Sequence, residues 1–257
     1  MSGIRVTVAA VQGSAPREEG ASMLVRADGI EGTIGGGALE WEAMRVARQM
    51  LADRRDYAEH RMPLGPALGQ CCGGAVVLRF ETCEALERAQ GAALWVWGAG
   101  HVGRAIVATM APLPHVTITW VDTGPGRFPD AVPDGVDTVI AADMPRLMAH
   151  APVHAHHLIL SYSHEIDLAL CHAALTRGFA SCGLIGSATK WARFRSRLGQ
   201  LGHSDAEISR IACPIGDPSL GKHPQSIAVG VAGRLLKEHL HKESAAKPVR
   251  RGKVTRT

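Results

Sequence analysis

A glycine-rich turn between two apolar segments restricts the fold of this chain more than any other feature. The turn reads Gly-Ala-Gly-His-Val-Gly from Gly98 to Gly103, after the apolar run 94–97 and before the apolar-periodic stretch 102–110. Asp122 ends the next apolar run, 19 residues after Gly103. A strand, a glycine turn, a helix and a distal acid in this order are typical of the Rossmann fold, in which the turn approaches a pyrophosphate and the acid binds a ribose. The candidate nucleotide contacts are Gly98, Gly100, His101, Gly103 and Asp122.

Residues 92–240 are predicted to form one α/β domain around this turn. Further short apolar runs, each next to a helical pattern, lie at 116–121, 138–140, 158–161 and 183–185. Strands that alternate with helices indicate a Rossmann-type parallel sheet. Asp167 is expected to cap a helix that Gly178 closes, and Ser204 to Glu207 has the pattern of a capping box.

Residues 1–88 are predicted to form a separate, small α+β domain. The runs that predict its strands lie at 4–11, 22–26, 31–34 and 75–80. A helix should follow Gly37, because apolar residues recur there at helical spacing. Its core face is expected to hold Leu39, Ala43, Ala47, Met50 and Leu51. Its solvent face is expected to hold Glu40, Arg45 and Arg48.

Three consecutive glycines, Gly35, Gly36 and Gly37, open this helix and offer a run of free backbone N–H groups. Such a run at a helix N-terminus is a candidate anion cradle. Ser14 and Arg17, in the sequence Gly-Ser-Ala-Pro-Arg, add a hydroxyl and a guanidinium that suit a phosphate. The alternative is an ordinary turn beside a solvated arginine.

Two adjacent cysteines, Cys71 and Cys72, lie in the segment Leu-Gly-Gln-Cys-Cys-Gly-Gly at 68–74. Soft thiolates suit molybdenum or sulfur-transfer chemistry better than they suit hard cations. Flanking glycines let a ligand approach the backbone, and adjacent side chains of an extended chain point to opposite faces, so one thiol is expected to face a site. The alternative is a pair of half-buried structural cysteines. The candidate contacts are Gln70, Cys71, Cys72, Gly73 and Gly74, with one of the two cysteines as the metal ligand.

Two segments that follow predicted strands add polar groups at the edge of the sheet where α/β proteins bind ligands. His164 follows the run 158–161, and Ser187 and Lys190 lie in the sequence Gly-Ser-Ala-Thr-Lys after 183–185. Lys190 is expected to act as the counter-charge for a bound anion. The four histidines between residues 150 and 157 lack the ligand spacing of a metal site and are interpreted as part of a solvated loop.

The formal net charge of +4 comes from the C-terminal tail. Residues 241–257 hold six lysines and arginines and one acid, whereas the remaining chain holds 22 basic and 23 acidic residues. The tail is predicted to be disordered, and the nearly neutral body argues against a nucleic-acid-binding protein. No run of about 18 apolar residues predicts a membrane span. Six cysteines without a C-x-x-C pair are typical of free thiols in a reducing cytoplasm.

Taken in order, these motifs resemble those of the XdhC/CoxI family of molybdenum-enzyme accessory proteins. The matching segments lie at 13–17, 32–40, 68–74, 98–103, 163–167, 183–190 and 213–216. The segment that carries the double cysteine is similar to the XdhC branch, which serves xanthine dehydrogenase.

The resemblance implies a cofactor carrier rather than an enzyme. Members of the family are understood to bind the molybdenum cofactor, molybdopterin, and to protect it while a cysteine desulfurase supplies its terminal sulfur. They then deliver it to the xanthine dehydrogenase apo-enzyme. By this resemblance, Cys71 or Cys72 contacts molybdenum or its sulfur. The sequence leaves open whether the chain forms a homodimer.

The rival interpretation is an NAD(P)-dependent oxidoreductase that uses the Gly98–Gly103 turn and Asp122. Arg127 lies close enough in the sequence to Asp122 to leave NADP open as the cofactor. The sequence offers no evident acid–base pair for hydride transfer, which favours the carrier.

Overall fold

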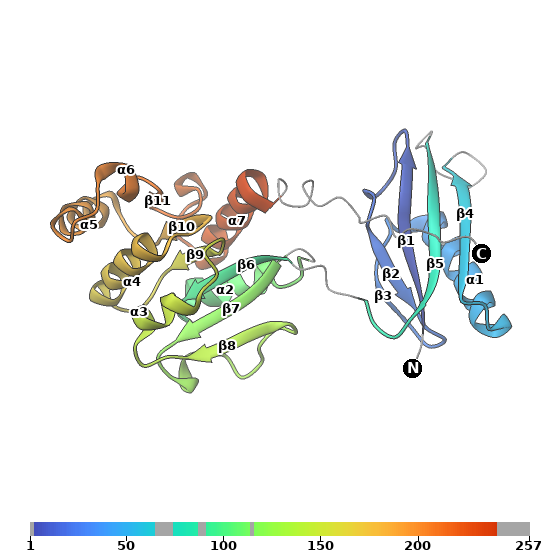
Figure 1. Ribbon diagram of the computed structural model, residues 1–257, viewed down its shortest axis with the longest axis horizontal. Coiled ribbons are helices and arrows are strands. Elements are labelled where there is room, and N and C mark those ends of the chain that lie inside the picture. Colours follow the sequence, from blue (N-terminus) through green and yellow to red (C-terminus); the bar gives the residue numbers. More distant parts are fainter. Residues whose placement is uncertain (1–2, 65–73, 87–90, 114–115, 241–257) are drawn as a thin grey trace, which may run out of the picture. The chain divides into compact units, whose positions relative to one another are not determined.

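The computed structural model describes residues 3–64, 74–86, 91–113 and 116–240. The chain divides into two compact units, the N-terminal unit Met1–Glu87 and the C-terminal unit Arg88–Thr257 (Figure 1). Each unit has its own hydrophobic core. Within the described ranges, no helix is both long and apolar enough to cross a membrane.

The N-terminal unit is built on a five-stranded antiparallel sheet with the order β3-β2-β1-β5-β4. Its strands are β1 (Gly3–Gln12), β2 (Ser22–Val25), β3 (Ile30–Gly32), β4 (Tyr57–Pro63) and β5 (Ala75–Cys83). Four of them match the runs expected from the sequence, and β4 was not expected. Only Ala58 and Met62 of β4 are buried, because β4 is an edge strand with a largely polar surface.

Helix α1 (Gly37–Asp53) packs on one face of this sheet. The predicted core face is confirmed, since Leu39, Ala43, Ala47 and Met50 are buried against strand residues such as Val6 and Phe80. The helix ends at Arg54, which adopts the left-handed conformation with φ of 53°.

The C-terminal unit is built on a six-stranded parallel sheet with the order β11-β10-β9-β6-β7-β8. Its strands are β6 (Ala92–Trp97), β7 (Val116–Asp122), β8 (Val136–Ile140), β9 (His156–Ile159), β10 (Ser181–Leu184) and β11 (Ile211–Ala212). The order of connection reverses between β6 and β9. In open α/β sheets, ligands bind at the carboxyl ends of the strands beside such a reversal. The predicted Rossmann-type fold is therefore confirmed.

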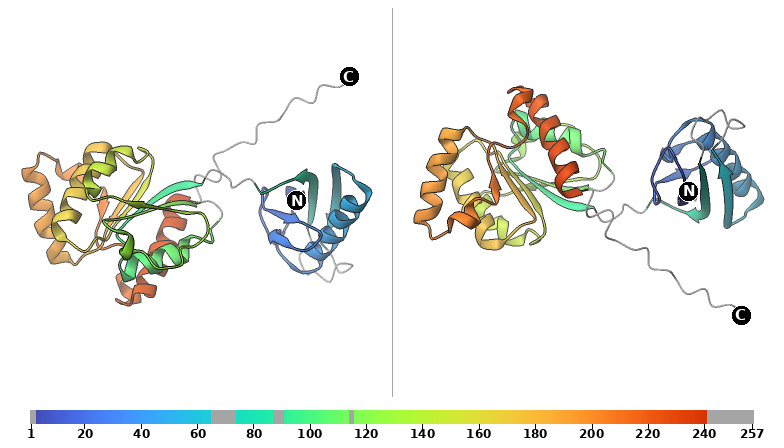
Figure 2. Two further views of the ribbon diagram at one scale, coloured as in Figure 1. Left: turned by 90° about the horizontal axis from the view of Figure 1, so that it is seen from below. Right: turned by 90° about the horizontal axis from the view of Figure 1, so that it is seen from above.

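Helices cover both faces of the parallel sheet (Figure 2). Helices α2 (His101–Met110) and α7 (Pro224–Leu235) pack on one face, where Leu94 and Val96 of β6 also point. The other face carries Trp95 and Trp97 of β6 and the helices α3 (Met144–Leu147), α4 (His164–Arg177), α5 (Ala188–Gln200) and α6 (Asp205–Ile208). Alternate residues of β6 thus supply two separate cores, as a strand buried on both faces requires.

Short helical segments complete the C-terminal unit. They are η2 (Pro125–Arg127), η3 (Met148–His150), η4 (Pro218–Leu220) and η5 (Leu236–Leu240).

Two local expectations are wrong. Asp167 does not cap α4; Ser163 does, and Asp167 lies one turn inside the helix with its side chain buried. Among the clustered histidines, His156 and His157 are buried residues of β9 rather than parts of a solvated loop. The C-terminal end of α4 at Gly178 and the capping box from Ser204 to Glu207 are both confirmed.

Candidate functional site

The glycine turn between β6 and α2 has the geometry that a phosphate-binding turn needs. A Cβ atom on Gly98 would lie 2.4 Å from the carbonyl oxygen of Leu160, and one on Gly103 would lie 2.1 Å from the carbonyl oxygen of Gly98. Both positions therefore exclude any side chain. Gly100, the N-cap of α2, faces open space instead, so a ligand has room beside the backbone there. The first N–H groups of α2 follow Gly100 and lack partners within the helix.

Asp122, the predicted ribose-binding acid, is buried at the end of β7 and braces this turn. Its Oδ2 accepts a hydrogen bond from the backbone N–H of Ala99 at 2.6 Å, and its Oδ1 accepts one from the N–H of Thr123 at 2.6 Å. The carboxylate thus holds the glycine turn against the end of β7.

Two arginines and a tyrosine surround the same turn. Arg104 of α2 donates from Nε to the carbonyl of Ala99 at 3.0 Å and from Nη2 to the carbonyl of Arg127 at 2.6 Å. The guanidinium of Arg127 lies 4.1 Å from the ring centroid of Tyr162, which belongs to the loop between β9 and α4. Tyr162 is 57% exposed, and Arg127 Nε is 3.8 Å from Asp122 Oδ1. Tyr162 was not predicted, because only the fold brings the β9–α4 loop beside the β7–β8 connection.

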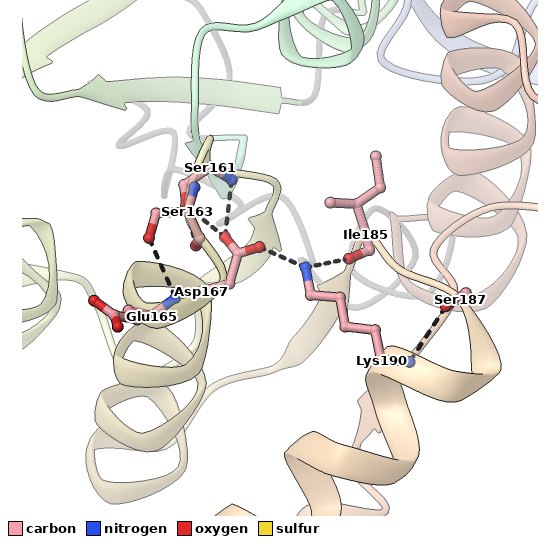
Figure 3. Close-up of polar contacts among 7 residues, drawn as sticks. All are labelled: Ser161, Ser163, Glu165, Asp167, Ile185, Ser187 and Lys190. Carbon is pink, nitrogen blue, oxygen red and sulfur yellow. Dashed lines mark hydrogen bonds and ion pairs between the residues drawn. The ribbon is translucent and has the colours of Figure 1, made fainter.

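A buried ion pair joins α4 to α5, the helices that follow β9 and β10 (Figure 3). Lys190 Nζ donates to Asp167 Oδ2 at 2.6 Å and to the carbonyl of Ile185 at 2.9 Å. The other oxygen of Asp167 accepts from the backbone N–H of Ser161 at 2.9 Å and lies 2.7 Å from the Ser161 hydroxyl. The side chains of Asp167 and Lys190 are only 1% and 10% exposed. This network fixes the loop that carries Tyr162.

The ion pair changes the interpretation of Lys190. Its ammonium group already balances the Asp167 carboxylate, so it is not a free counter-charge for an incoming anion in this state. Ser187 caps α5 by accepting the backbone N–H of Lys190 at 3.2 Å. His164 is exposed at the start of α4, and its ring meets Phe194 edge-on.

Three thiols lie on the face of the sheet that α4 and α5 cover, namely Cys171, Cys182 and Cys213. Burial raises the pKa of Cys182 to about 12 and that of Cys213 to about 11, and it also raises the pKa of Cys171. These thiols are therefore protonated at neutral pH and are poor nucleophiles.

Three separate motifs of the N-terminal unit lie together in neighbouring loops. A Cβ atom on Gly35 would lie 2.4 Å from Cβ of Pro16 and 3.3 Å from Cγ of Arg17. A Cβ atom on Gly74 would lie 2.4 Å from the carbonyl oxygen of Ser14. We call these residues, with Gly36 and Gly37, the loop cluster. It joins the turn after β1, the start of α1 and the residue that precedes β5.

The amides at Gly35 and Gly36 already have hydrogen-bond partners within the chain. Glu40 of α1 accepts from the N–H groups of Ile34 at 3.0 Å and Gly36 at 3.1 Å, and Gly35 donates to the Thr33 hydroxyl at 3.1 Å. Glu40 therefore folds back on the loop instead of pointing to solvent. Burial raises the pKa of Glu40, but the hydrogen bonds from Thr33, Ile34 and Gly36 outweigh burial, and the pKa is lowered overall.

Other parts of the loop cluster remain accessible. A Cβ atom on Gly36, whose φ is 71°, would meet no other atom within 4 Å. Arg17 pairs with the neighbouring Glu18 at 3.0 Å on the surface. Gln70, Cys71, Cys72 and Gly73 lie outside the described residues. Among the described residues, no group of three or more His, Cys, Asp and Glu side chains is placed to hold a metal ion.

The sequence matches two family profiles. The profile described as "XdhC Rossmann domain" matches residues 94–235, which cover the parallel sheet, and the profile described as "XdhC and CoxI family" matches residues 2–60. The second match includes Ser14, Arg17 and the three glycines that open α1.

Individual proteins that resemble this chain include one curated sequence and one solved structure. The uncharacterized protein YqeB of Escherichia coli is 29% identical over 229 residues, which are 88% of this chain and 41% of YqeB, so this chain spans about two-fifths of that relative. The crystal structure of a xanthine dehydrogenase from Bacillus halodurans superposes with a TM-score of 0.75 at 17% identity and covers 96% of this chain and 94% of that one. At this identity the structural likeness supports the fold.

Proposed function

Because this chain belongs to the XdhC and CoxI family, we propose that it is an accessory protein that binds the molybdenum cofactor, supports its sulfuration and inserts it into xanthine dehydrogenase. The observation that carries this proposal is the convergence of Ser14, Gly35 and Gly74 in the loop cluster. These residues come from three motifs that the family resemblance singles out.

The double cysteine supplies the soft ligand in this proposal. Cys72 precedes Gly74 by two residues, so the thiols belong to the segment that leads directly into the loop cluster. A thiolate is a soft, sulfur-based ligand that suits molybdenum–sulfur chemistry, and a thiolate from Cys71 or Cys72 would contact the metal or its terminal sulfur. When bound, the cofactor supplies a molybdenum centre that accepts a sulfur atom. Gln70 and Gly73 would line the same approach.

The loop cluster fits the anionic part of such a ligand in two respects. Gly35 and Gly74 exclude side chains, and the space above Gly36 is open. Its backbone N–H groups already bind one carboxylate, that of Glu40, so they are oriented toward negative charge. Ser14 and Arg17 would add a hydroxyl and a guanidinium for a phosphate. Glu40 positions the loop in the absence of ligand.

The turn of the C-terminal unit would bind a phosphate of the cofactor or of a nucleotide. Gly98 and Gly103 set the tight geometry, and the N–H groups that follow Gly100, beginning with His101, would donate to the anion. Asp122 would bind a ribose if its bond to Ala99 opened. His164, Ser187 and Lys190 lie on the segments that follow β9 and β10 at this same edge, and they would border the ligand.

The partners in this proposal are the xanthine dehydrogenase apo-enzyme and a cysteine desulfurase, and the compartment is the cytoplasm. The protein would act as a monomer or a homodimer, with the domains 1–88 and 92–240 and the tail 241–257. A second candidate function is an NAD(P)-dependent oxidoreductase, which the close packing at Gly98 and Gly103 favours. The carrier is preferred because the Asp122 carboxylate is already engaged by the turn.

The test is co-purification after expression with a source of molybdenum cofactor. Bound molybdenum would be measured by mass spectrometry, and pterin by fluorescence after oxidation. The wild type should retain both, whereas Cys71→Ala or Cys72→Ala should lose them. Cys83→Ala, a change at a half-buried cysteine of the same unit, is the matched control and should retain both. A wild type without molybdenum and pterin would overturn the carrier, and NAD-dependent turnover would support the second candidate.

A further inference from the structure

Helix α5 has an unusual charge pattern for a helix that packs on a domain core. Its thirteen residues include Lys190, Arg193, Arg195 and Arg197 but no acid. The helix is held to the sheet by Phe194 and Leu198, which are buried. Its packing therefore needs none of the three arginines.

Two of these cations have no counter-charge within the described part of the chain. Lys190 pairs with Asp167, and Arg195 lies 3.7 Å from Asp205. By contrast, Arg193 and Arg197 make no ion pair with any described residue, and both are exposed. They are four residues apart, so they lie one above the other on the same side of the helix.

This arrangement costs stability. Like charges at this spacing repel each other and destabilise a helix, in contrast to the acid–base pairs that helices commonly carry. A residue that destabilises its own helix is expected where that residue serves a function. The Arg193–Arg197 pair therefore points to a negatively charged partner outside the chain.

We propose that the Arg193–Arg197 face of α5 docks on an acidic protein surface. This inference rests on the proposed function, under which that surface belongs to the molybdoenzyme that receives the cofactor. Arginine binds carboxylates in a two-pronged geometry and is enriched at the centres of protein interfaces. The face lies at the periphery of the C-terminal unit, and α5 begins at the Lys190–Asp167 network beside the carboxyl ends of the strands (Figures 1 and 3).

The size of the positive face favours a protein over a nucleic acid. Among the residues at helical spacing from the pair, Thr189 and Gln200 are uncharged and exposed, and Lys190 is mostly buried and paired with Asp167, so the exposed positive stretch spans only two side chains. Each phosphate that a basic side chain neutralises adds to the affinity for a nucleic-acid backbone, so two side chains supply little of it. Two arginines one helical turn apart match a small cluster of carboxylates instead.

The experiment measures binding of the cofactor-loaded full chain to the apo-form of the xanthine dehydrogenase encoded in the same genome. Biolayer interferometry at 50 and 200 mM salt would give the Kd. We expect the double variant R193E/R197E to raise the Kd about 30-fold, the size of effect typical of interface hot spots. Salt should weaken wild-type binding, and it should weaken the variant less.

The matched control is R48E/R146E, which makes the same change in net charge at two exposed arginines outside α5. Its Kd should stay within about threefold of the wild type. The milder variant R193Q/R197Q removes charge without reversing it and should weaken binding by an intermediate factor. It keeps the test valid if R193E/R197E does not fold.

Several results would overturn the inference. The inference is wrong if both R193E/R197E and R193Q/R197Q bind the apo-enzyme with the wild-type Kd. It is also wrong if the R48E/R146E control loses as much binding as R193E/R197E. Wild-type retention of a single-stranded RNA at 150 mM salt that depends on Arg193 and Arg197 would also overturn it. If the wild type retains cofactor and binds the apo-enzyme but both arginine variants bind as tightly as the wild type, this inference fails alone. If the wild type neither retains cofactor nor binds the apo-enzyme, the proposed function fails as well.

Discussion

The loop cluster of the N-terminal unit and the sheet edge of the C-terminal unit both hold a loop in place with a carboxylate. In the first, Glu40 accepts two backbone N–H groups and a hydroxyl while it stays half-buried. In the second, Asp167 accepts a backbone N–H and a hydroxyl but is only 1% exposed, and Lys190 neutralises it. Burial explains the difference, because a fully buried charge needs a counter-charge whereas a half-buried one can rely on water and hydrogen bonds.

The glycines of the two regions also differ in how tightly the surrounding atoms pack on them. Gly103 is required by the carbonyl of Gly98 in the same strand–turn–helix unit, and Gly98 by the carbonyl of Leu160 at the end of the neighbouring strand β9, whereas Gly35 and Gly74 are required by contacts with Pro16 and Ser14. The C-terminal edge is therefore a tightly packed scaffold, held by backbone contacts within the turn and with the neighbouring strand β9. The loop cluster depends on three segments and has open space at Gly36, as suits a place where a ligand enters and leaves.

The largest test of this comparison removes the counter-charge of the buried carboxylate. Lys190→Met should lower the free energy of unfolding by about 4 kcal/mol, because Asp167 would remain buried without a partner. Urea denaturation followed by tryptophan fluorescence would measure it.

Lys222→Met, at an exposed lysine, is the control and should change stability by less than about 0.5 kcal/mol. Adding Asp167→Asn to Lys190→Met should restore most of the loss. A single variant as stable as the wild type would show that the pair is not needed.

Acid should destabilise the C-terminal unit through His157. Burial, with a smaller contribution from His156, lowers the pKa of His157 to about 4 from an ordinary value of 6.5. Trp97 Nε1 donates to His157 Nδ1 at 3.1 Å, and His157 Nε2 has no hydrogen-bond partner within the described ranges. Between pH 6.5 and 4 the unfolded chain binds this proton and the folded chain does not. Stability should therefore fall as the pH falls, by roughly 3 kcal/mol over this window.

The measurement is the pH dependence of the unfolding free energy, read from tryptophan fluorescence. His157→Gln keeps an acceptor for Trp97 and removes the titration, so its stability should depend less on pH in this window. Equal slopes for the variant and the wild type would assign the acid sensitivity to other groups.

Gly→Ala substitutions should lower stability by a smaller amount than the changes above, and the cost should differ between the two regions. Gly103→Ala should cost about 2 kcal/mol, since the new Cβ would lie 2.1 Å from a carbonyl oxygen. Gly36→Ala should cost about 1 kcal/mol, because its Cβ meets open space and only the positive φ of 71° is unfavourable. Gly100→Ala, with φ of −71° and open space, is the control and should cost less than either. Thermal melts would rank the three, and the reverse order would contradict the packing described here.

The sequence predicted the C-terminal edge better than the loop cluster for a physical reason. The turn from Gly98 to Gly103 and its flanking strand and helix are contiguous, so their periodicity and spacing are visible in the chain. The Asp167–Lys190 pair joins the helices that follow two neighbouring strands, and no local pattern reveals that neighbourhood. Helical periodicity also placed Glu40 on the solvent face, because it carries no information about a side chain that turns back to the preceding loop. Strand β4 escaped prediction because only two of its seven side chains are buried.

The smallest expected effect concerns Glu40, whose role separates the loop cluster from the buried edge most directly. Glu40→Gln keeps the size of the side chain but replaces a charged acceptor of three hydrogen bonds with a neutral one, so it should cost about 1 kcal/mol at pH 7. The folded-state pKa of Glu40 lies below its ordinary value of 4.5. Its contribution is thus present above pH 4.5 and is lost as the pH falls through the folded pKa. The variant and the wild type should therefore converge in stability at low pH. Glu42→Gln, at a neighbouring glutamate that pairs with surface Arg45, is the control. A Glu40→Gln cost of 3 kcal/mol or more would mean that Glu40 behaves like a buried charge, and the contrast with Asp167 would then be wrong.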